Sequence, residues 1–254
     1  MNHPRLDREI EALLEQVSAD LLDRGARATL LVGSHAKGTA RPDSDVDIFA
    51  VGEGPHESFF IVDGHRVSVH WWQPEQARER IFQPQSAFLA VSAWRDAVVI
   101  DDPHGLGVEL QTQAREWRWE AIEAEADAWV VDKLVGWAEY VMKLAAAVEA
   151  GRELDARALA AEITLRVAEV CAVQSRLLAE SENGLWEQIA IAGGPEWRRA
   201  QEQAFAAHGE SAAEAATGAI RLFELAVGEA DELFDEEQRE LVEHALATSR
   251  SRSD

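Results

Sequence analysis

The hydrophobic pattern of the chain changes once, near residue 105, and this change limits the possible folds more than any other feature. Before it, short runs of β-forming residues alternate with turns; after it, apolar residues recur at helical spacing in segments rich in Ala, Leu and Glu. The 254 residues are enough to bury two small cores. We therefore expect two domains, residues 1–105 and residues 106–254.

The first region predicts an α/β domain in which a mixed sheet is flanked by helices. Apolar residues recur at helical spacing over 6–22, and Gly25 suits the end of that helix. Two β-forming runs flank Asp63-Gly64, a pair that favours a tight hairpin turn. The pattern also predicts, in chain order, strands over 28–32 and 45–51, helices over 75–82 and 86–95, and a strand over 97–100.

The second region predicts five or six helices. Turn-forming or helix-breaking residues interrupt the helical pattern near 119, 151–152, 183–184, 193–195 and 208–209. Antiparallel helices joined by short loops commonly form bundles. We expect an all-α helical bundle after residue 105.

One segment of the first region combines residues that suit phosphate and metal binding. An apolar strand ends at Gly33-Ser34, where the lack of a side chain lets backbone N–H groups approach an anion and the Ser34 hydroxyl adds a donor. Asp45 and Asp47 follow, separated by one apolar residue. Period-two alternation directs both carboxylates to one face of a strand.

Two adjacent carboxylates beside a phosphate-binding turn suit Mg²⁺, which takes oxygen ligands from one or two carboxylates and from substrate phosphates. Each half of this pattern is common by itself, because Asp-x-Asp is often a solvated strand edge and Gly-Ser is often a plain turn. The combination also includes Lys37, Gly38 and Ser44 in the intervening loop. Motif and context together therefore favour a nucleotide site.

The segment resembles the signature of the nucleotidyltransferase superfamily related to DNA polymerase β. The whole layout resembles the small bacterial, antibiotic-type members, which have a C-terminal helical domain that helps to bind the acceptor. The resemblance implies transfer of a nucleoside monophosphate to a hydroxyl of a small molecule, with AMP from ATP as the first expectation and another nucleoside triphosphate as the alternative donor. It assigns phosphate binding to Gly33, Ser34, Lys37 and Ser44, and Mg²⁺ binding and catalysis to Asp45 and Asp47.

The chain departs from that family at a third acidic residue, which in the family stands on a later strand and often acts as the general base. The matching stretch, residues 66–72, offers Ser68 and His70 on the corresponding face. Three alternatives follow. His70 could be the base, since histidine exchanges protons near neutral pH; a carboxylate such as Glu162 or Glu169 could come from the helical region; or the domain could bind nucleotide without efficient transfer.

The net charge of −23, from 24 Lys+Arg and 47 Asp+Glu, excludes two classes of function. Coating nucleic acid and binding anionic membranes both need clustered basic residues. An acidic protein instead attracts cations, so a cationic, aminoglycoside-like acceptor fits. We expect a small-molecule acceptor and neither nucleic acid nor a membrane as partner, and the oligomeric state stays open.

The single cysteine, Cys171, cannot form an internal disulfide, and no apolar stretch is long enough to span a membrane. A cytoplasmic location is therefore expected. The histidines lack the spacing of a zinc site. The alternative to an enzyme is a nucleotide-binding regulatory module, such as an antitoxin-like partner of another protein.

Overall fold

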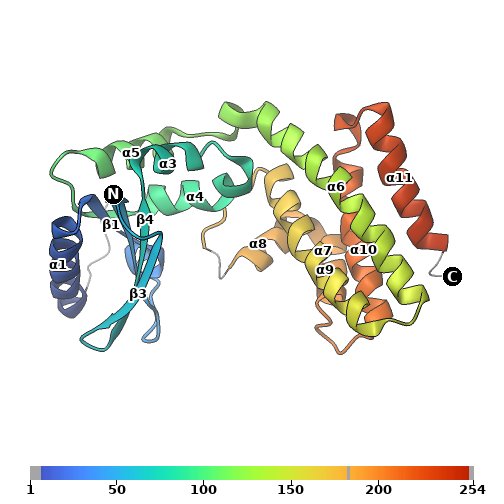
Figure 1. The fold of residues 1–254 in the computed structure, drawn as a ribbon, viewed down its shortest axis with the longest axis horizontal. Coiled ribbons are helices and arrows are strands. Elements are labelled where there is room, and N and C mark those ends of the chain that lie inside the picture. Colours follow the sequence, from blue (N-terminus) through green and yellow to red (C-terminus); the bar gives the residue numbers. More distant parts are fainter. Residues whose placement is uncertain (1–6, 182–183, 252–254) are drawn as a thin grey trace. The chain divides into compact units, whose positions relative to one another are not determined.

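The computed structural model describes residues 7–181 and 184–251 and divides the chain into two compact units, Met1–Ala121 and Ile122–Asp254 (Figure 1). The first unit is a mixed α/β domain and the second is all helical, which confirms the expected fold class. The division comes later than the boundary expected after residue 105, because helix α5 (Leu106–Glu116) packs on elements of the first unit.

The first unit contains a five-stranded sheet with the order β3-β4-β2-β1-β5. Strand β1 lies antiparallel to β2 and β5, β2 lies parallel to β4, and β3 forms an antiparallel hairpin with β4. The expected mixed sheet is therefore present. The strands span Ala26–Val32 (β1), Val46–Gly52 (β2), Glu57–Val62 (β3), His65–Trp72 (β4) and Val98–Asp101 (β5).

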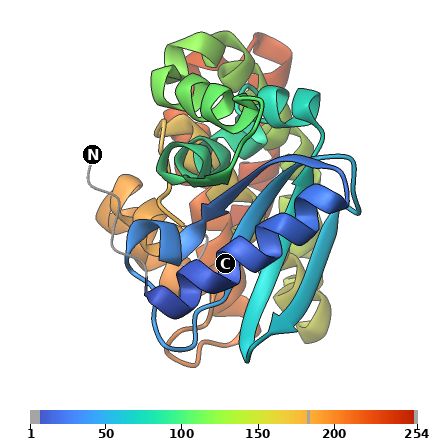
Figure 2. The same ribbon diagram turned by 90° about the vertical axis from the view of Figure 1, so that its left-hand side faces the viewer.

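Helix α1 (Arg8–Asp23) lies across one face of this sheet (Figure 2). The Asp7 side chain accepts a hydrogen bond from the Glu9 N–H and caps the helix N-terminus. One stripe of the helix is buried against alternate residues of the strands. This apolar layer comprises Ile10, Leu13, Leu14, Val17 and Leu21 of α1 with Leu31, Val46, Ile48, Ala50, Val67, Val69 and Trp71 of the sheet.

The opposite face of the sheet carries the intervening residues of β2 and β4, including Asp47, Phe49, Ser68 and His70, and we call it the site face. Helix α4 covers part of it, because the Trp94 ring packs on Phe49 with centroids 4.7 Å apart. The other helices of this unit are α2 (Gly33–Lys37), α3 (Pro74–Arg80), α4 (Pro84–Asp96) and α5.

Arg95 joins α4 to the C-terminal end of α5. Its Nε donates to the Ala114 carbonyl at 2.7 Å and its Nη2 donates to the Trp117 carbonyl at 2.5 Å. Burial lowers the pKa of this guanidinium, but the two carbonyls still accept its hydrogen bonds. These contacts, with the packing of α5 on α4 and β1, place α5 in the first unit.

The second unit is a helical bundle. Helix α7 packs against α6 and α10, α11 packs against α6, and α9 packs against α10. Gly218 allows the last of these contacts, because a Cβ there would lie 2.8 Å from the Ala200 carbonyl oxygen. The helices are α6 (Glu123–Glu149), α7 (Glu153–Gln174), α8 (Leu185–Ala192), α9 (Gly194–Ala204), α10 (Ala212–Glu229) and α11 (Glu236–Ser251), with short 3₁₀ turns at Trp119–Ile122 and Asp231–Leu233.

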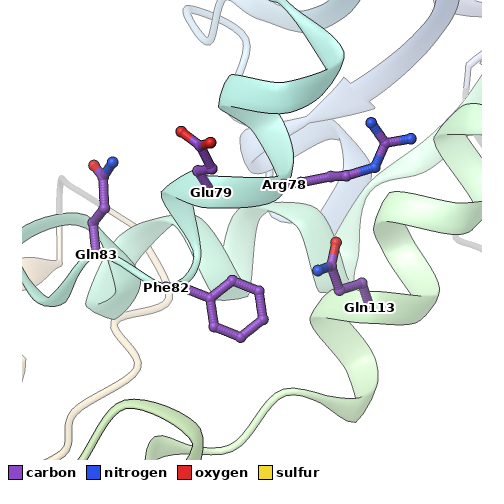
Figure 3. A pocket seen from close by; sticks show the side chains of 5 residues that line it. All are labelled: Arg78, Glu79, Phe82, Gln83 and Gln113. Atoms are coloured by element: carbon purple, nitrogen blue, oxygen red, sulfur yellow. The ribbon is translucent and has the colours of Figure 1, made fainter. Parts of the chain in front are cut away.

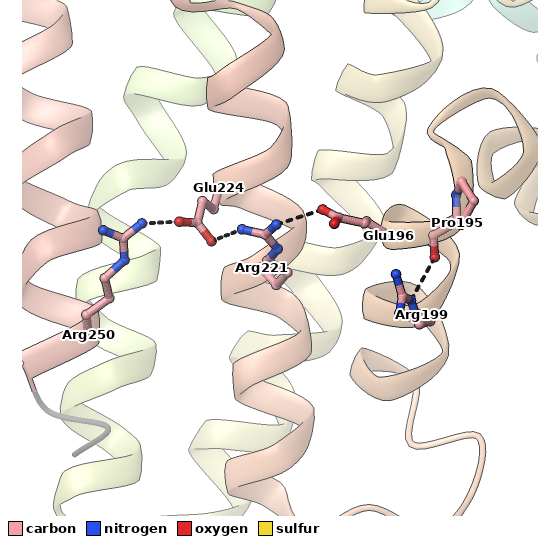
Figure 4. Close-up of polar contacts among 6 residues, drawn as sticks. All are labelled: Pro195, Glu196, Arg199, Arg221, Glu224 and Arg250. Carbon is pink, nitrogen blue, oxygen red and sulfur yellow. Dashed lines mark hydrogen bonds and ion pairs between the residues drawn. The ribbon is translucent and has the colours of Figure 1, made fainter.

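An ion network crosses the bundle surface from α9 to α11 (Figure 4). Arg221 contacts Glu196 at 2.8 Å and also pairs with Glu224, which accepts a second hydrogen bond from Arg250. Burial of Glu224 disfavours its ionisation, yet the hydrogen bonds from the two arginines outweigh this and lower the pKa of its carboxyl. The network thus holds a carboxylate between two cations.

Two further findings bear on the sequence predictions, one on Cys171 in the bundle and one on all the described helices. Cys171 is buried, and this burial raises the pKa of its thiol to about 11, which is typical of an unreactive core cysteine. Among the helices of residues 7–181 and 184–251, none is long and apolar enough to cross a membrane.

Candidate active site

The end of β1 brings Gly33 against the carboxylate of Asp47. Val32, the last residue of β1, pairs with Asp47 of β2, and the chain then turns through Gly33 with a φ of +69°. A Cβ at Gly33 would overlap Oδ2 of Asp47. The backbone angle therefore favours glycine here, and a side chain at this position would displace the Asp47 carboxylate.

After Gly33 the chain forms the five-residue helix α2 instead of the open loop expected from sequence. The turn ends at Gly38, with a φ of +70°, and the Thr39 N–H donates to the Ser34 carbonyl at 2.9 Å. Gly33 and Ser34 are half-buried at the start of this turn. The turn fixes the Ser34 backbone close to the end of β1.

Asp45 immediately precedes β2, which begins at Val46, so the strand begins one residue later than expected. Asp45 and Asp47 are both half-buried, whereas Val46 between them is fully buried in the layer beneath α1. Asp47 lies on the site face directly opposite Ser68 of β4. The two carboxylates are thus carried by the segment that enters β2, and their shared face and metal binding stay predictions.

Ser44, expected beside the phosphates, closes the turn before Asp45. Its Oγ accepts a hydrogen bond from the Arg41 N–H at 2.9 Å, and its own N–H donates to the Arg41 carbonyl at 3.0 Å. The Ser44 hydroxyl therefore has a structural role in placing Asp45.

His35 is a residue of this region that the sequence analysis did not single out. Its imidazole forms a hydrogen bond to the backbone of Ser44, which ties α2 to the segment before Asp45. Burial lowers the pKa of His35, and the contact with Ser44 opposes that shift. From the other side, Arg66 of β4 donates to the Asp43 carbonyl. The loop before β2 is thus held by two side chains that no short motif identifies.

Lys37, the other residue expected beside the phosphates, pairs with Asp96 of α4. The Nζ–Oδ2 distance is 3.2 Å, and the lysine side chain is 19% exposed. Any phosphate that Lys37 binds therefore competes with Asp96 for the ammonium group.

His70 lies on the site face one diagonal step from Asp47, since Asp47 pairs with Ser68 and Phe49 pairs with His70. Its Nε2 lies 3.4 Å from the Ser68 Oγ, and its Nδ1 lies 3.4 Å from Oε1 of Glu57 on β3. Phe49 meets the imidazole edge-on. Sequence reasoning identified Ser68 and His70 but missed Glu57.

The sequence of the hairpin turn could have identified Glu57, because the turn fixes which residues of β3 and β4 pair. Asp63 and Gly64 both have positive φ, and Val62 pairs directly with His65 across this two-residue turn. Each step back along β3 then matches one step forward along β4, which pairs Glu57 with His70. The turn type alone therefore fixes this contact.

The other two candidates for the base belong to the second unit. Glu162 is exposed on α7, and Glu169 of the same helix pairs with Arg166 at 3.3 Å. Neither is one of the residues that form the site face.

The donor set near the Gly33 turn fits a divalent cation bound together with phosphates. Asp45 and Asp47 offer carboxylate oxygens, and the glycine leaves the space beside Asp47 free of a side chain. Mg²⁺ is commonly held by one or two carboxylates while substrate phosphates complete its ligands. Within the part of the chain that the structure describes, no group of three or more His, Cys, Asp or Glu side chains is placed to hold a metal ion.

A shallow depression of about 470 Å³ lies elsewhere on the first unit, among α3, the α3–α4 turn and α5. Figure 3 shows its lining side chains, Arg78, Glu79, Phe82, Gln83 and Gln113. Arg78 also donates to Glu109 at 2.9 Å, which raises the pKa of the guanidinium. The depression contains none of the residues predicted to bind nucleotide, so we place the site at the Gly33 turn instead.

The chain is similar to known proteins both in sequence and in fold. Residues 10–133 match the family model of the nucleotidyltransferase domain. The fold is similar to the crystal structure of a nucleotidyltransferase-like protein from Exiguobacterium sibiricum 255-15, with a TM-score of 0.54 and 15% sequence identity over 91% of this chain and 80% of that one. No curated protein matches the sequence. Residues 10–133 of this chain therefore match the nucleotidyltransferase domain of transferase enzymes, which supports a relation to the nucleotidyltransferase superfamily.

Proposed function

We propose that the chain transfers AMP from ATP to a hydroxyl group of a small molecule and releases pyrophosphate, with a divalent metal ion, Mg²⁺, bound at the site. The observation that carries the proposal is the packing of Gly33 against the Asp47 carboxylate, with Asp45 two residues away on the same segment. In that arrangement the glycine turn can bind phosphate through its backbone, and the two carboxylates can bind the metal ion of a metal-bound triphosphate.

The residues of the turn bind and orient the nucleotide. Asp45 and Asp47 hold Mg²⁺, which when bound neutralises phosphate charge. The backbone of Gly33 and the hydroxyl of Ser34 bind the phosphates, with Lys37 and Ser44 beside them. Catalysis by these groups consists of positioning and charge stabilisation, as in other phosphoryl-group transfers.

His70 is the general base in this proposal. Its imidazole lies on the site face, 32% exposed, on the strand next to the one that follows Asp45. It accepts the proton of the acceptor hydroxyl as that oxygen attacks the α-phosphorus. A cationic, antibiotic-like acceptor is the first class to test, because the chain carries a net charge of −23.

One observation favours a second candidate, a nucleotide-binding regulatory module that acts on a protein partner. Ser68, and not a carboxylate, stands opposite Asp47 on β4. A site without a third carboxylate can bind nucleotide and still transfer it poorly. The two candidates share the nucleotide site and differ in the chemistry that follows binding.

Calorimetry with a non-hydrolysable ATP analogue tests the shared site. We expect micromolar binding in Mg²⁺, and loss of that binding in EDTA or in the double variant Asp45→Asn, Asp47→Asn. The matched control is Glu11→Gln, because Glu11 is exposed on α1 and lies on the layer opposite the site face. Binding that is unchanged in the double variant would refute the proposal.

Pyrophosphate release then separates the two candidates. With wild-type chain, ATP and Mg²⁺, a panel of cationic hydroxyl compounds is expected to contain an acceptor that triggers release. Binding of nucleotide without release in any acceptor mixture would favour the regulatory module, and pull-down of a partner in an ATP-dependent manner would support it.

A further inference from the structure

We infer that Glu57 is a positioning residue that fixes the tautomer of His70 and, together with it, takes the place of the missing third carboxylate. This inference rests on the proposed function, in which His70 is the base. Glu57 reaches the site face from the edge strand β3, where it pairs directly with His70. Its Oε1 lies 3.4 Å from Nδ1 of the imidazole.

The two nitrogens of His70 have different partners. Glu57, as a carboxylate, can only accept, so the contact at Nδ1 requires a proton on that nitrogen. Nε2 then carries the lone pair and accepts from the Ser68 hydroxyl, 3.4 Å away. The carboxylate contact at Nδ1 thus sets the protonation state of Nε2, which is the basic nitrogen.

The lone pair on Nε2 faces the part of the sheet that carries the metal ligand. Ser68 lies directly opposite Asp47 across the parallel β2–β4 pair, and His70 lies two residues further along the same strand. Strand spacing and rise place the Cα atoms of Asp47 and His70 about 8 Å apart. An acceptor hydroxyl fits between a nucleotide at Asp47 and a base at His70, where it can replace Ser68 as the donor to Nε2.

The transfer step balances with these groups. The acceptor hydroxyl gives its proton to Nε2 of His70 while its oxygen forms a bond to the α-phosphorus of ATP. The bond from that phosphorus to the bridging oxygen breaks, and pyrophosphate leaves with the electron pair. The Glu57 carboxylate then faces an imidazolium ion, so the positive charge formed in the step has a counter-charge at Nδ1.

A surface ion pair without a catalytic role is the competing explanation for the Glu57–His70 contact, because the Glu57 side chain is 60% exposed. The two explanations differ in what removal of Glu57 changes. A surface pair without a catalytic role can still set the tautomer of His70, but its removal leaves kcat unchanged. A positioning residue affects both the tautomer and kcat.

Nitrogen-15 NMR of the nucleotide-free chain tests the tautomer directly. At about pH 8, where histidine is neutral, we expect His70 to carry its proton on Nδ1 in the wild type and mainly on Nε2 in Glu57→Ala. The spectrum of His70→Asn assigns the signals, and Glu11→Ala is the matched control on the far layer. A wild-type His70 protonated on Nε2, or the same tautomer in Glu57→Ala, would overturn the inference.

Kinetics with ATP and an accepted hydroxyl compound provide the second readout. We expect Glu57→Ala to lower kcat about tenfold with little change in KM for ATP, and Glu57→Asp to recover part of the loss. An unchanged kcat would overturn the inference. The tautomer measurement needs no activity, so a chain that shows the tautomer change but transfers nothing supports the Glu57–His70 pair and contradicts the proposed function alone.

Discussion

Two ends of the site face are positioned by different means. At the β1–β2 end, strand pairing brings Gly33 and Asp47 together, and the Asp47 carboxylate fills the space that a side chain at Gly33 would need. At the β4–β3 end, the exposed side chain of Glu57 meets the half-buried side chain of His70 at 3.4 Å. We call the first end backbone-held, because the backbone of Gly33 lies against a single side chain, and the second end side-chain-held, because its contact is lost when either side chain is replaced. We therefore expect substitutions at the two ends to differ in size and in kind.

Asp47→Asn is the substitution with the largest expected effect. It removes a carboxylate from the metal site, and the charge stabilisation lost amounts to several kcal/mol, so kcat/KM falls about a thousandfold. That loss is far greater than the tenfold expected for Glu57→Ala. Pyrophosphate release under matched conditions measures both. Equal losses of activity in Asp47→Asn and Glu57→Ala would show that the two ends of the site face contribute equally to catalysis, and would contradict the difference expected between them.

Gly33→Ala tests the backbone-held end with a matched control in the same unit. Both Gly33 and Gly64 have positive φ, but a Cβ at Gly64 meets open space whereas one at Gly33 overlaps Asp47. We expect Gly64→Ala to lower the free energy of unfolding by about 1 kcal/mol, from the backbone angle alone. Gly33→Ala is expected to cost about 2–3 kcal/mol, because steric displacement adds to that angle.

Urea unfolding and analogue binding measure these two effects. Gly33→Ala is also expected to weaken binding of the ATP analogue about tenfold, since the displaced Asp47 carboxylate is a metal ligand in the proposal. Gly64→Ala leaves binding unchanged. If the two alanine variants bind the analogue equally well, the close approach of Gly33 to Asp47 has no role in the site.

The difference between the two ends also explains what the sequence could predict. Gly33, Asp45 and Asp47 belong to one short segment, so local pattern and spacing identify them. The contact of Glu57 with His70 depends on strand register, which follows from the Asp63-Gly64 turn but from no motif.

Other features depend on packing between distant parts of the chain and were beyond local reasoning. The apolar stripe of α5 shows that the helix is buried but does not show against which core, so the expected boundary differs from the observed division after Ala121. Likewise, the contact of His35 with Ser44 forms only when the Gly33 turn becomes helical. Hydrophobic periodicity carries no information on either contact.

Glu224 in the helical unit is a second carboxylate that is held by side chains. Its replacement has the smallest expected effect of the substitutions discussed. Arg221 and Arg250 lower the pKa of this carboxyl, although burial opposes them. A carboxyl whose pKa is lower in the folded than in the unfolded chain stabilises the fold at pH values above its unfolded pKa. This contribution is lost as the pH falls through the folded pKa. Glu224→Gln is therefore expected to lower the free energy of unfolding at pH 7 by about 0.5 kcal/mol.

Urea unfolding of the wild type and Glu224→Gln at several pH values measures this contribution. The gap between them is expected to shrink as the pH falls below about 4.5, where an unperturbed glutamate becomes protonated, and to shrink at high salt. Glu187→Gln is the control, because Glu187 contacts the single cation Arg198 at a fully exposed position. A gap that is independent of pH would show that Glu224 acts through packing and not through its charge, and that a carboxylate held between two arginines contributes no more than an uncharged side chain.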